Sequence, residues 1–197
     1  MDYGALFSYS PYGTSEEEEL SRSYRSAVKN DEPIRIAGRE VPMPEFVAQT
    51  LKESRATLPF GRLFDSKPVL VPVTSSSLKN PDSLWVPFRI ASAMQSRGLG
   101  SSVSVCLVRK CPVQRAATSI SGKRPKAIEH YESQEVQKLI ADPESILLVD
   151  DVVTSGATLV GSALRLAEAY PKTRIFGFAA MKLSQYPPQY HDACKVE

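Results

Sequence analysis

The chain has 197 residues, a formal net charge of +2 and 23% charged residues. That length suits one α/β domain with a modest appendage, and the balanced charge creates no global field that would attract a nucleic acid or a membrane. No apolar run has the length of a membrane span and the first residues do not open a signal peptide, so we expect a cytoplasmic protein. The three cysteines are scattered and have no zinc spacing, which predicts reduced thiols.

The amino-terminal residues predict a small helical unit. Ser15 and Glu18 have the spacing of a capping box, and apolar residues recur behind them at helical intervals. Residues 31–42 predict a hairpin that turns near Ala37-Gly38, and a second helix follows it. We assign residues 1–60 to an amino-terminal subdomain and residues 61–197 to the core.

The core is predicted to begin with a buried strand at Val69 to Val73. A run of small hydroxyl residues follows this strand, and such a run can form a nest for an anion, although a plain polar loop explains it equally well. A helix of about residues 86–97 and a further strand at Val103 to Val108 come next. The hydroxyl run is Thr74-Ser75-Ser76-Ser77, and Lys79 follows it.

Residues 109–126 form the most basic segment of the chain, with six cationic side chains and no acidic one. A charge run is usually a solvated loop, and that alternative stays open. The position between two core strands favours a mobile lid that closes over a phosphorylated ligand. Nucleic-acid binding is the weaker hypothesis because the segment has no aromatic platform.

The most specific pattern is the run at 146–158, ILLVDDVVTSGAT. Its apolar start predicts a strand covered on both faces of a parallel sheet. Asp150 and Asp151 follow, and paired carboxylates can accept hydrogen bonds from vicinal hydroxyls. A turn of Thr, Ser and Gly then leads into a helix, whose backbone N–H groups and dipole can bind an anion. The pattern is typical of a site for a phosphorylated ribose; the alternative is a solvated Asp-Asp turn with an ordinary helix cap.

The helix after this run is predicted to bury one apolar stripe, which consists of Val160, Ala163, Leu164 and Ala167. Arg174 to Ala180 is predicted to be the next buried strand, which completes a strand–helix–strand unit. The fold class is therefore α/β, with a mostly parallel sheet.

The thirteen residues resemble the motif of type I phosphoribosyltransferases (PRTases) that binds 5-phosphoribosyl 1-diphosphate (PRPP). Only Ser155 and Ala157 depart from the residues frequent there. The resemblance implies a Rossmann-like sheet flanked by helices with a small amino-terminal hood, and it implies that Asp150 and Asp151 contact the ribose hydroxyls. The residues that would bind the 5'-phosphate are Thr154, Ser155, Gly156, Ala157 and Thr158.

The whole layout resembles the ComF-like branch of these enzymes over about residues 20–183. The supporting residues are Tyr24 to Lys29 (YRSAVK), Val71-Pro72-Val73 and Gln114. Longer ComF proteins carry an amino-terminal cysteine cluster for zinc, which this chain lacks. Type I relatives often form dimers, so a homodimer is expected by analogy.

The resemblance implies Mg²⁺-dependent transfer of the phosphoribosyl group from PRPP to a nitrogen acceptor, with release of pyrophosphate. The transition state would be oxocarbenium-like. Mg²⁺ would be bound largely through substrate oxygens, with the two aspartates as candidate protein ligands. The catalytic candidates are Asp150, Asp151 and Arg115, and the pyrophosphate-binding candidates are Thr74, Ser75, Ser76, Lys79, Arg115 and Arg124.

The acceptor is not defined by the sequence. Thr154 stands where the purine enzymes place an acidic residue that can act as a base, and threonine cannot do so. Lys182 is the candidate acceptor-binding residue, with a surface lysine at a strand end as the alternative. A second hypothesis is therefore a PRPP-sensing regulatory or interaction protein that binds PRPP without turnover. A third hypothesis is a different α/β nucleotide-binding protein.

Overall fold

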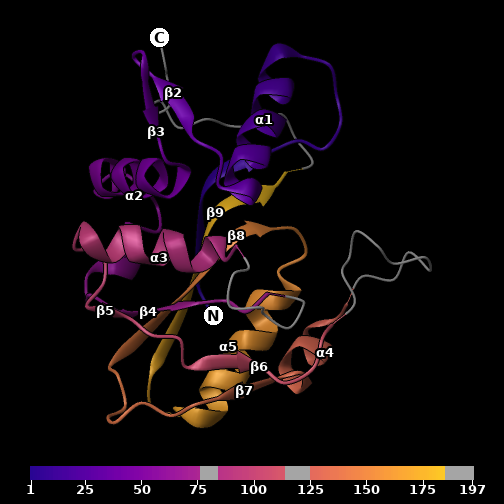
Figure 1. Cartoon of the computed structure of the whole chain (residues 1–197). Helices are drawn as coiled ribbons and strands as arrows, with labels where there is room; N and C mark the ends of the chain where they lie inside the picture. Colours follow the sequence, from indigo (N-terminus) through magenta and orange to yellow (C-terminus); the bar gives the residue numbers. More distant parts are fainter. Residues whose placement is uncertain (76–83, 114–124, 185–197) are drawn as a thin grey trace.

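A five-stranded sheet forms the centre of the protein, and every strand pair in it is parallel (Figure 1). The computed structural model describes residues 1–75, 84–113 and 125–184. The strands lie in the order β1-β9-β8-β4-β5. Their bounds are Tyr3–Tyr9 for β1, Val69–Pro72 for β4, Ser102–Val103 for β5, Ser145–Val153 for β8 and Arg174–Leu183 for β9. The predicted class, a mostly parallel sheet flanked by helices, is confirmed.

Helices cover both faces of the sheet (Figure 1). One face packs against α1 (Glu16–Asn30), α2 (Met43–Ser54) and α3 (Val86–Ser96), and the other packs against α5 (Ala157–Ala169). Strand β8 separates two apolar cores because its side chains alternate: Leu147 and Val149 belong to the first core, and Ile146 and Leu148 to the second. All four are fully buried, so the predicted apolar run is confirmed as a two-sided strand.

The amino-terminal predictions are confirmed in their local detail. Ser15 and Glu18 form the capping box at the start of α1. The hairpin of β2 (Ile34–Ile36) and β3 (Arg39–Val41) turns at Ala37 and Gly38, which have φ values of 47° and 77°. A 3-10 turn at Gly61–Phe64 then leads into the core.

Strand β1 was not predicted, and it pairs in parallel with β9 at one edge of the main sheet. Residues 3–9 therefore belong to the same sheet as β8. The boundary at residue 60 stays a prediction for the segments that follow β1.

The predicted strand at 103–108 is wrong as a single element. The chain leaves the sheet after Val103, and β6 (Leu107–Arg109) pairs instead with β7 (Gln134–Val136) in an antiparallel hairpin. A short helix, α4 (Ala127–Glu132), lies between β6 and β7 in the chain and packs on α5. In the chain, the basic segment therefore begins at the end of β6 and ends before β7.

The predicted stripe of α5 is also wrong in most of its members. The helix packs on the sheet through Leu159, Ala163 and Leu166, whereas Val160 and Leu164 are 44% and 51% exposed. The helix is apolar on more than one side, so its spacing alone did not identify the buried side. The exposed side of α5 lines a cavity of about 550 Å³ together with Tyr3.

The sheet has a topological switch point between β4 and β8. From β4 the chain passes through α3 to the outer strand β5, whereas from β8 it passes through α5, on the opposite face, to β9 on the other side. A crevice opens at the carboxyl ends of two strands that diverge in this way, and ligands of α/β proteins bind there. Within the described ranges, no helix is long and apolar enough to cross a membrane.

Candidate functional site

A cavity of about 670 Å³ lies at the switch point. It brings together the loop that follows β4 and the loop that follows β8, which are far apart in the sequence. The remaining walls are formed by residues of β1, α1, α3 and α4 and by residues that directly precede α3 and α4. The predicted site residues that line it are Thr74, Ser75, Asp150, Asp151, Thr154, Ser155, Ala157 and Thr158.

The sequence predicted that the two aspartates follow the strand. In the structure they lie within β8, which continues to Val153. On one side β8 continues to pair with β9 as far as Val153. On the other side its pairing with β4 ends at Val149, opposite Pro72. Asp150 is therefore the first residue of β8 after the pairing with β4 ends, and it lines the cavity there.

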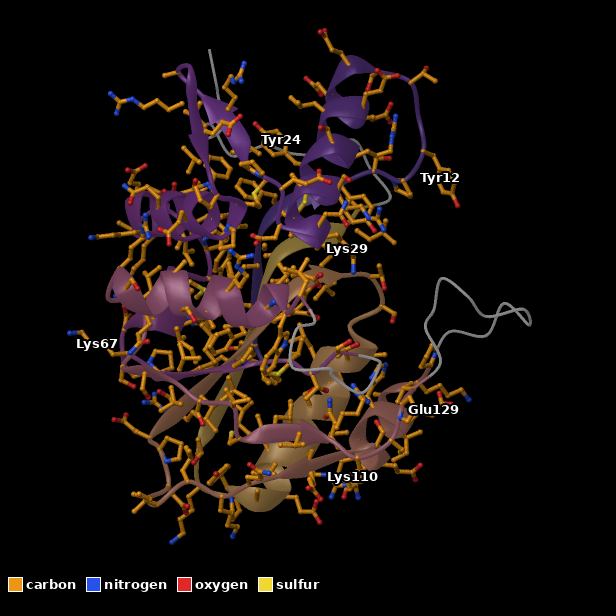
Figure 2. The ribbon with its side chains drawn as sticks, in the orientation of Figure 1. Tyr12, Tyr24, Lys29, Lys67, Lys110 and Glu129 are labelled. Atoms are coloured by element: carbon orange, nitrogen blue, oxygen red, sulfur yellow. The ribbon has the colours of Figure 1, made fainter. Side chains whose placement is uncertain are left out.

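Hydrogen bonds and an ion pair fix the aspartates. Asp150 Oδ1 accepts from the backbone N–H of Asp151 at 2.9 Å, and Asp151 Oδ1 accepts from the N–H of Val152 at 2.7 Å. Asp151 Oδ2 lies 3.4 Å from Lys29 Nζ. Figure 2 shows Lys29 at the end of α1 that is nearest to the ends of the strands. The sequence did not indicate Lys29 as part of this site, because it comes from a helix more than 100 residues earlier.

The environment of Asp150 opposes its charge. Burial raises the pKa of Asp150 well above its ordinary value, and the neighbouring Asp151 carboxylate raises it further, whereas Lys29 has a smaller opposite effect. Ionising a buried carboxyl beside a second carboxylate is energetically unfavourable. Carboxyl groups with such a raised pKa are concentrated at functional sites.

The loop before α5 presents hydrogen-bond donors at a helix N-terminus. Gly156 is the N-cap of the helix, with φ of 77°, a left-handed conformation that glycine adopts without strain. Ser155 Oγ accepts a long hydrogen bond from the N–H of Ala157, at 3.5 Å. The N–H groups of the first helical turn have no partner within the helix itself. The hydroxyls of Thr154 and Thr158 line the cavity beside them, and N–H groups in such a position are able to bind an anion.

The loop after β4 is held by Arg109, whose role the sequence did not reveal. This side chain is buried at the end of β6 and is not part of a solvated lid. It donates to the Ser75 carbonyl, to Thr74 Oγ1 at 2.9 Å and to Ser133 Oγ at 2.5 Å. Burial lowers the pKa of Arg109 to about 10, so the group stays cationic at neutral pH. Its charge therefore lies beneath the candidate pyrophosphate loop.

Gln134 links the same loop to α5. Its Nε2 donates to Thr74 Oγ1 at 2.8 Å and to Ser162 Oγ at 3.1 Å, and both contacts are buried. His130 also lines the cavity, and burial lowers its pKa, with the Arg109 cation lowering it further. The β6–β7 region thus joins the loop after β4 to α5, the helix that follows the loop after β8.

Other predicted residues are not brought into the cavity or are not described. Lys182 is exposed in β9 and does not line the cavity. Gly156 lines the cavity of about 550 Å³ and not the switch-point cavity. Ser76, Lys79, Arg115 and Arg124 lie outside the described residues, as do Gln114 and Cys194. Of the other cysteines, Cys106 is buried and Cys111 exposed, and both are free thiols.

The described residues contain no cluster of three or more His, Cys, Asp or Glu side chains that could hold a metal ion by itself. Two adjacent carboxylates are present, however. Mg²⁺ is commonly bound through one or two carboxylates together with substrate phosphates and water. Asp150 and Asp151 fit such a shared site and do not fit a metal site made by protein ligands alone.

The fold and the cavity together define an α/β protein with a polar cavity at its switch point, lined by two carboxylates and several hydroxyl side chains. Similar solved structures include the hypoxanthine phosphoribosyltransferase of Staphylococcus aureus, at 14% identity and a TM-score of 0.36, over 82% of this chain and 84% of that one. The adenine phosphoribosyltransferase of Saccharomyces cerevisiae, in a structure that contains adenine, gives 20% identity and a TM-score of 0.37, over 82% of this chain and 89% of that one.

No family model matches the sequence, and no curated protein matches it significantly. Both structures have TM-scores below 0.5, so no function is inferred from them for this chain. The ComF-like assignment stays a prediction, and the functional conclusion rests on the geometry of the site.

Proposed function

We propose that this protein is a phosphoribosyltransferase that binds PRPP at the switch point and transfers its phosphoribosyl group to a nitrogen acceptor. One observation carries the proposal: the aspartate pair, of which Asp150 is buried, lines the same cavity as the loop after β4 and the loop after β8. PRPP has the matching order of groups, with vicinal hydroxyls between a 5'-phosphate and a pyrophosphate.

Each part of the cavity has a separate task in this mechanism. The start of α5 binds the 5'-phosphate through Thr154, Thr158 and backbone N–H groups. Asp150 and Asp151 accept hydrogen bonds from the ribose hydroxyls and place negative charge near the cation that develops at C1'. The Thr74–Ser75 loop, with the Arg109 cation beneath it, binds the pyrophosphate as it leaves.

Mg²⁺, when bound with PRPP, would neutralise negative charge on the leaving pyrophosphate. Asp150 and Asp151 are the candidate protein ligands. The further candidates for pyrophosphate binding, Arg115 among them, remain predictions from the sequence. A homodimer also remains a prediction.

A PRPP-sensing protein without turnover is the second candidate function. Thr154 favours it, because threonine cannot replace the acidic base of the purine enzymes. Both candidates require the same PRPP site, so binding alone does not separate them.

A pyrophosphate-release assay with PRPP, Mg²⁺ and a panel of nucleobases and amines separates the two functions. We expect release that depends on both the protein and one class of acceptor. PRPP binding without release for any acceptor would favour the sensor. The matched control is the protein with Asp150→Asn and Asp151→Asn, for which we expect neither binding nor release.

A further inference from the structure

The sheet order places the two partners of the proposed reaction on opposite sides of β8. The Thr74–Ser75 loop, which would bind pyrophosphate, follows β4 on one side, and β9 and β1 lie on the other side. When a glycosyl transfer inverts C1', the acceptor attacks the face opposite the leaving group. The acceptor should therefore lie toward the ends of β9 and β1 and the helix α1 above them.

Two cations of α1 line the cavity on this side. Arg25 and Lys29 are four residues apart and hence on one side of the helix. Lys29 is already paired with Asp151 at 3.4 Å. Arg25 lies over the ring of Tyr9, the last residue of β1, with its guanidinium carbon 5.3 Å from the ring centroid.

Among the described residues, Arg25 is the cation of this wall that has no carboxylate partner. No carboxylate of the described residues lies within 4.0 Å of it. Its Nε is buried and has no hydrogen-bond partner among those residues. A buried donor without an acceptor is unfavourable, and a guanidinium matches the two oxygens of a carboxylate. Arg25 therefore presents a positive charge and an unpaired N–H donor on the side of the cavity where the acceptor is expected.

We infer that the acceptor is itself an anion, a heterocycle bearing a carboxylate, and that Arg25 binds this carboxylate. The inference rests on the proposed function, because it presumes PRPP at the switch point. Under the proposed function the phosphate groups of PRPP bind at the loops after β4 and β8, which leaves the wall formed by Tyr9 and Arg25 for the acceptor.

Paired acceptors that differ mainly in one carboxylate test the inference. Nicotinate with nicotinamide and orotate with uracil are suitable pairs. Each would be titrated calorimetrically into protein saturated with Mg²⁺ and PRPP, and pyrophosphate release would be measured in parallel. The variants are Arg25→Met and the control Arg39→Met, an exposed arginine of β3 that does not line the cavity.

We expect the carboxylated member of at least one pair to bind about tenfold or more tightly than its neutral partner. Arg25→Met should abolish this preference and leave the Kd for PRPP within about twofold, and Arg39→Met should change neither. Three results would overturn the inference: neutral acceptors bind better, neither member of any pair binds, or Arg25→Met weakens PRPP binding and leaves the preference unchanged. If PRPP itself fails to bind, the proposed function fails first, and the inference falls with it.

Discussion

Replacing Arg109 by methionine should weaken PRPP binding selectively. The side chain makes three hydrogen bonds, and two of them end on the Thr74–Ser75 loop. Two acceptors keep another bond after the change: Thr74 Oγ1 still accepts from Gln134, and Ser133 Oγ still donates to the His130 carbonyl. We therefore expect a stability loss of about 1–3 kcal/mol, as for hydrogen bonds to a charged group.

This loss is smaller than for a broken buried ion pair, which costs about 3–5 kcal/mol, because Arg109 has no carboxylate partner among the described residues. The effect on binding should be about tenfold in the Kd for PRPP, or about 1.4 kcal/mol, since the loop loses both its position and the nearby positive charge. Ribose 5-phosphate lacks the pyrophosphate, so its Kd should change little.

The assay is calorimetric titration of both ligands with Mg²⁺, alongside thermal unfolding. Lys110→Met is the matched control, because Lys110 is the next residue and is exposed. An equal loss of affinity for PRPP and ribose 5-phosphate would refute the reasoning, since it would mean that Arg109 supports the whole fold and not the pyrophosphate loop. An unchanged PRPP affinity in a folded variant would refute it as well.

Three further changes have definite expected outcomes. Asp150→Asn should raise the melting temperature of the ligand-free protein at neutral pH. Burial and the Asp151 carboxylate raise the pKa of Asp150 in the folded protein. The folded protein therefore loses stability as the pH rises from the ordinary pKa of aspartate through this raised pKa, and asparagine removes that loss. Thermal unfolding from about pH 4 to 7 should show a shallower decline for the variant than for the parent. Gly156→Ala should cost about 1–2 kcal/mol through its left-handed φ of 77° and should weaken ribose 5-phosphate binding, with chemical unfolding and titration as the measurements. Gly161→Ala should destabilise the protein by about 1–3 kcal/mol, because the added Cβ would lie 2.6 Å from the Cβ of His130; an unchanged unfolding midpoint would contradict this packing.

Local patterns with a direct physical cause could be read from the sequence. The apolar run before Asp150 required a strand covered on both faces, and Ser15 with Glu18 required a helix start. The positions of Gly38 and Gly156 likewise follow from backbone conformations that glycine favours. These features depend on residues close together in the chain.

Features set by distant partners could not be read in this way. Strand β1 is defined by its pairing with β9, about 170 residues later. Arg109 belongs to a run of basic residues, and only the antiparallel pairing of β6 with β7 buries it against Ser133. Arg25 and Lys29 look like ordinary charges of an amphipathic helix until α1 is placed over the end of β8. For these three cations, tertiary packing determines which of several similar residues lies at the site.

The most direct test of the central proposal is calorimetric titration of the protein with PRPP and Mg²⁺, beside the variant with Asp150→Asn and Asp151→Asn. We predict binding by the parent protein and its loss, by about 100-fold or more, in the variant, because two charged hydrogen-bond acceptors are removed from the ribose site. Thermal unfolding would verify that the variant is folded. Equal affinity of the two proteins for PRPP, or no binding by the parent, would contradict the assignment of the switch-point cavity.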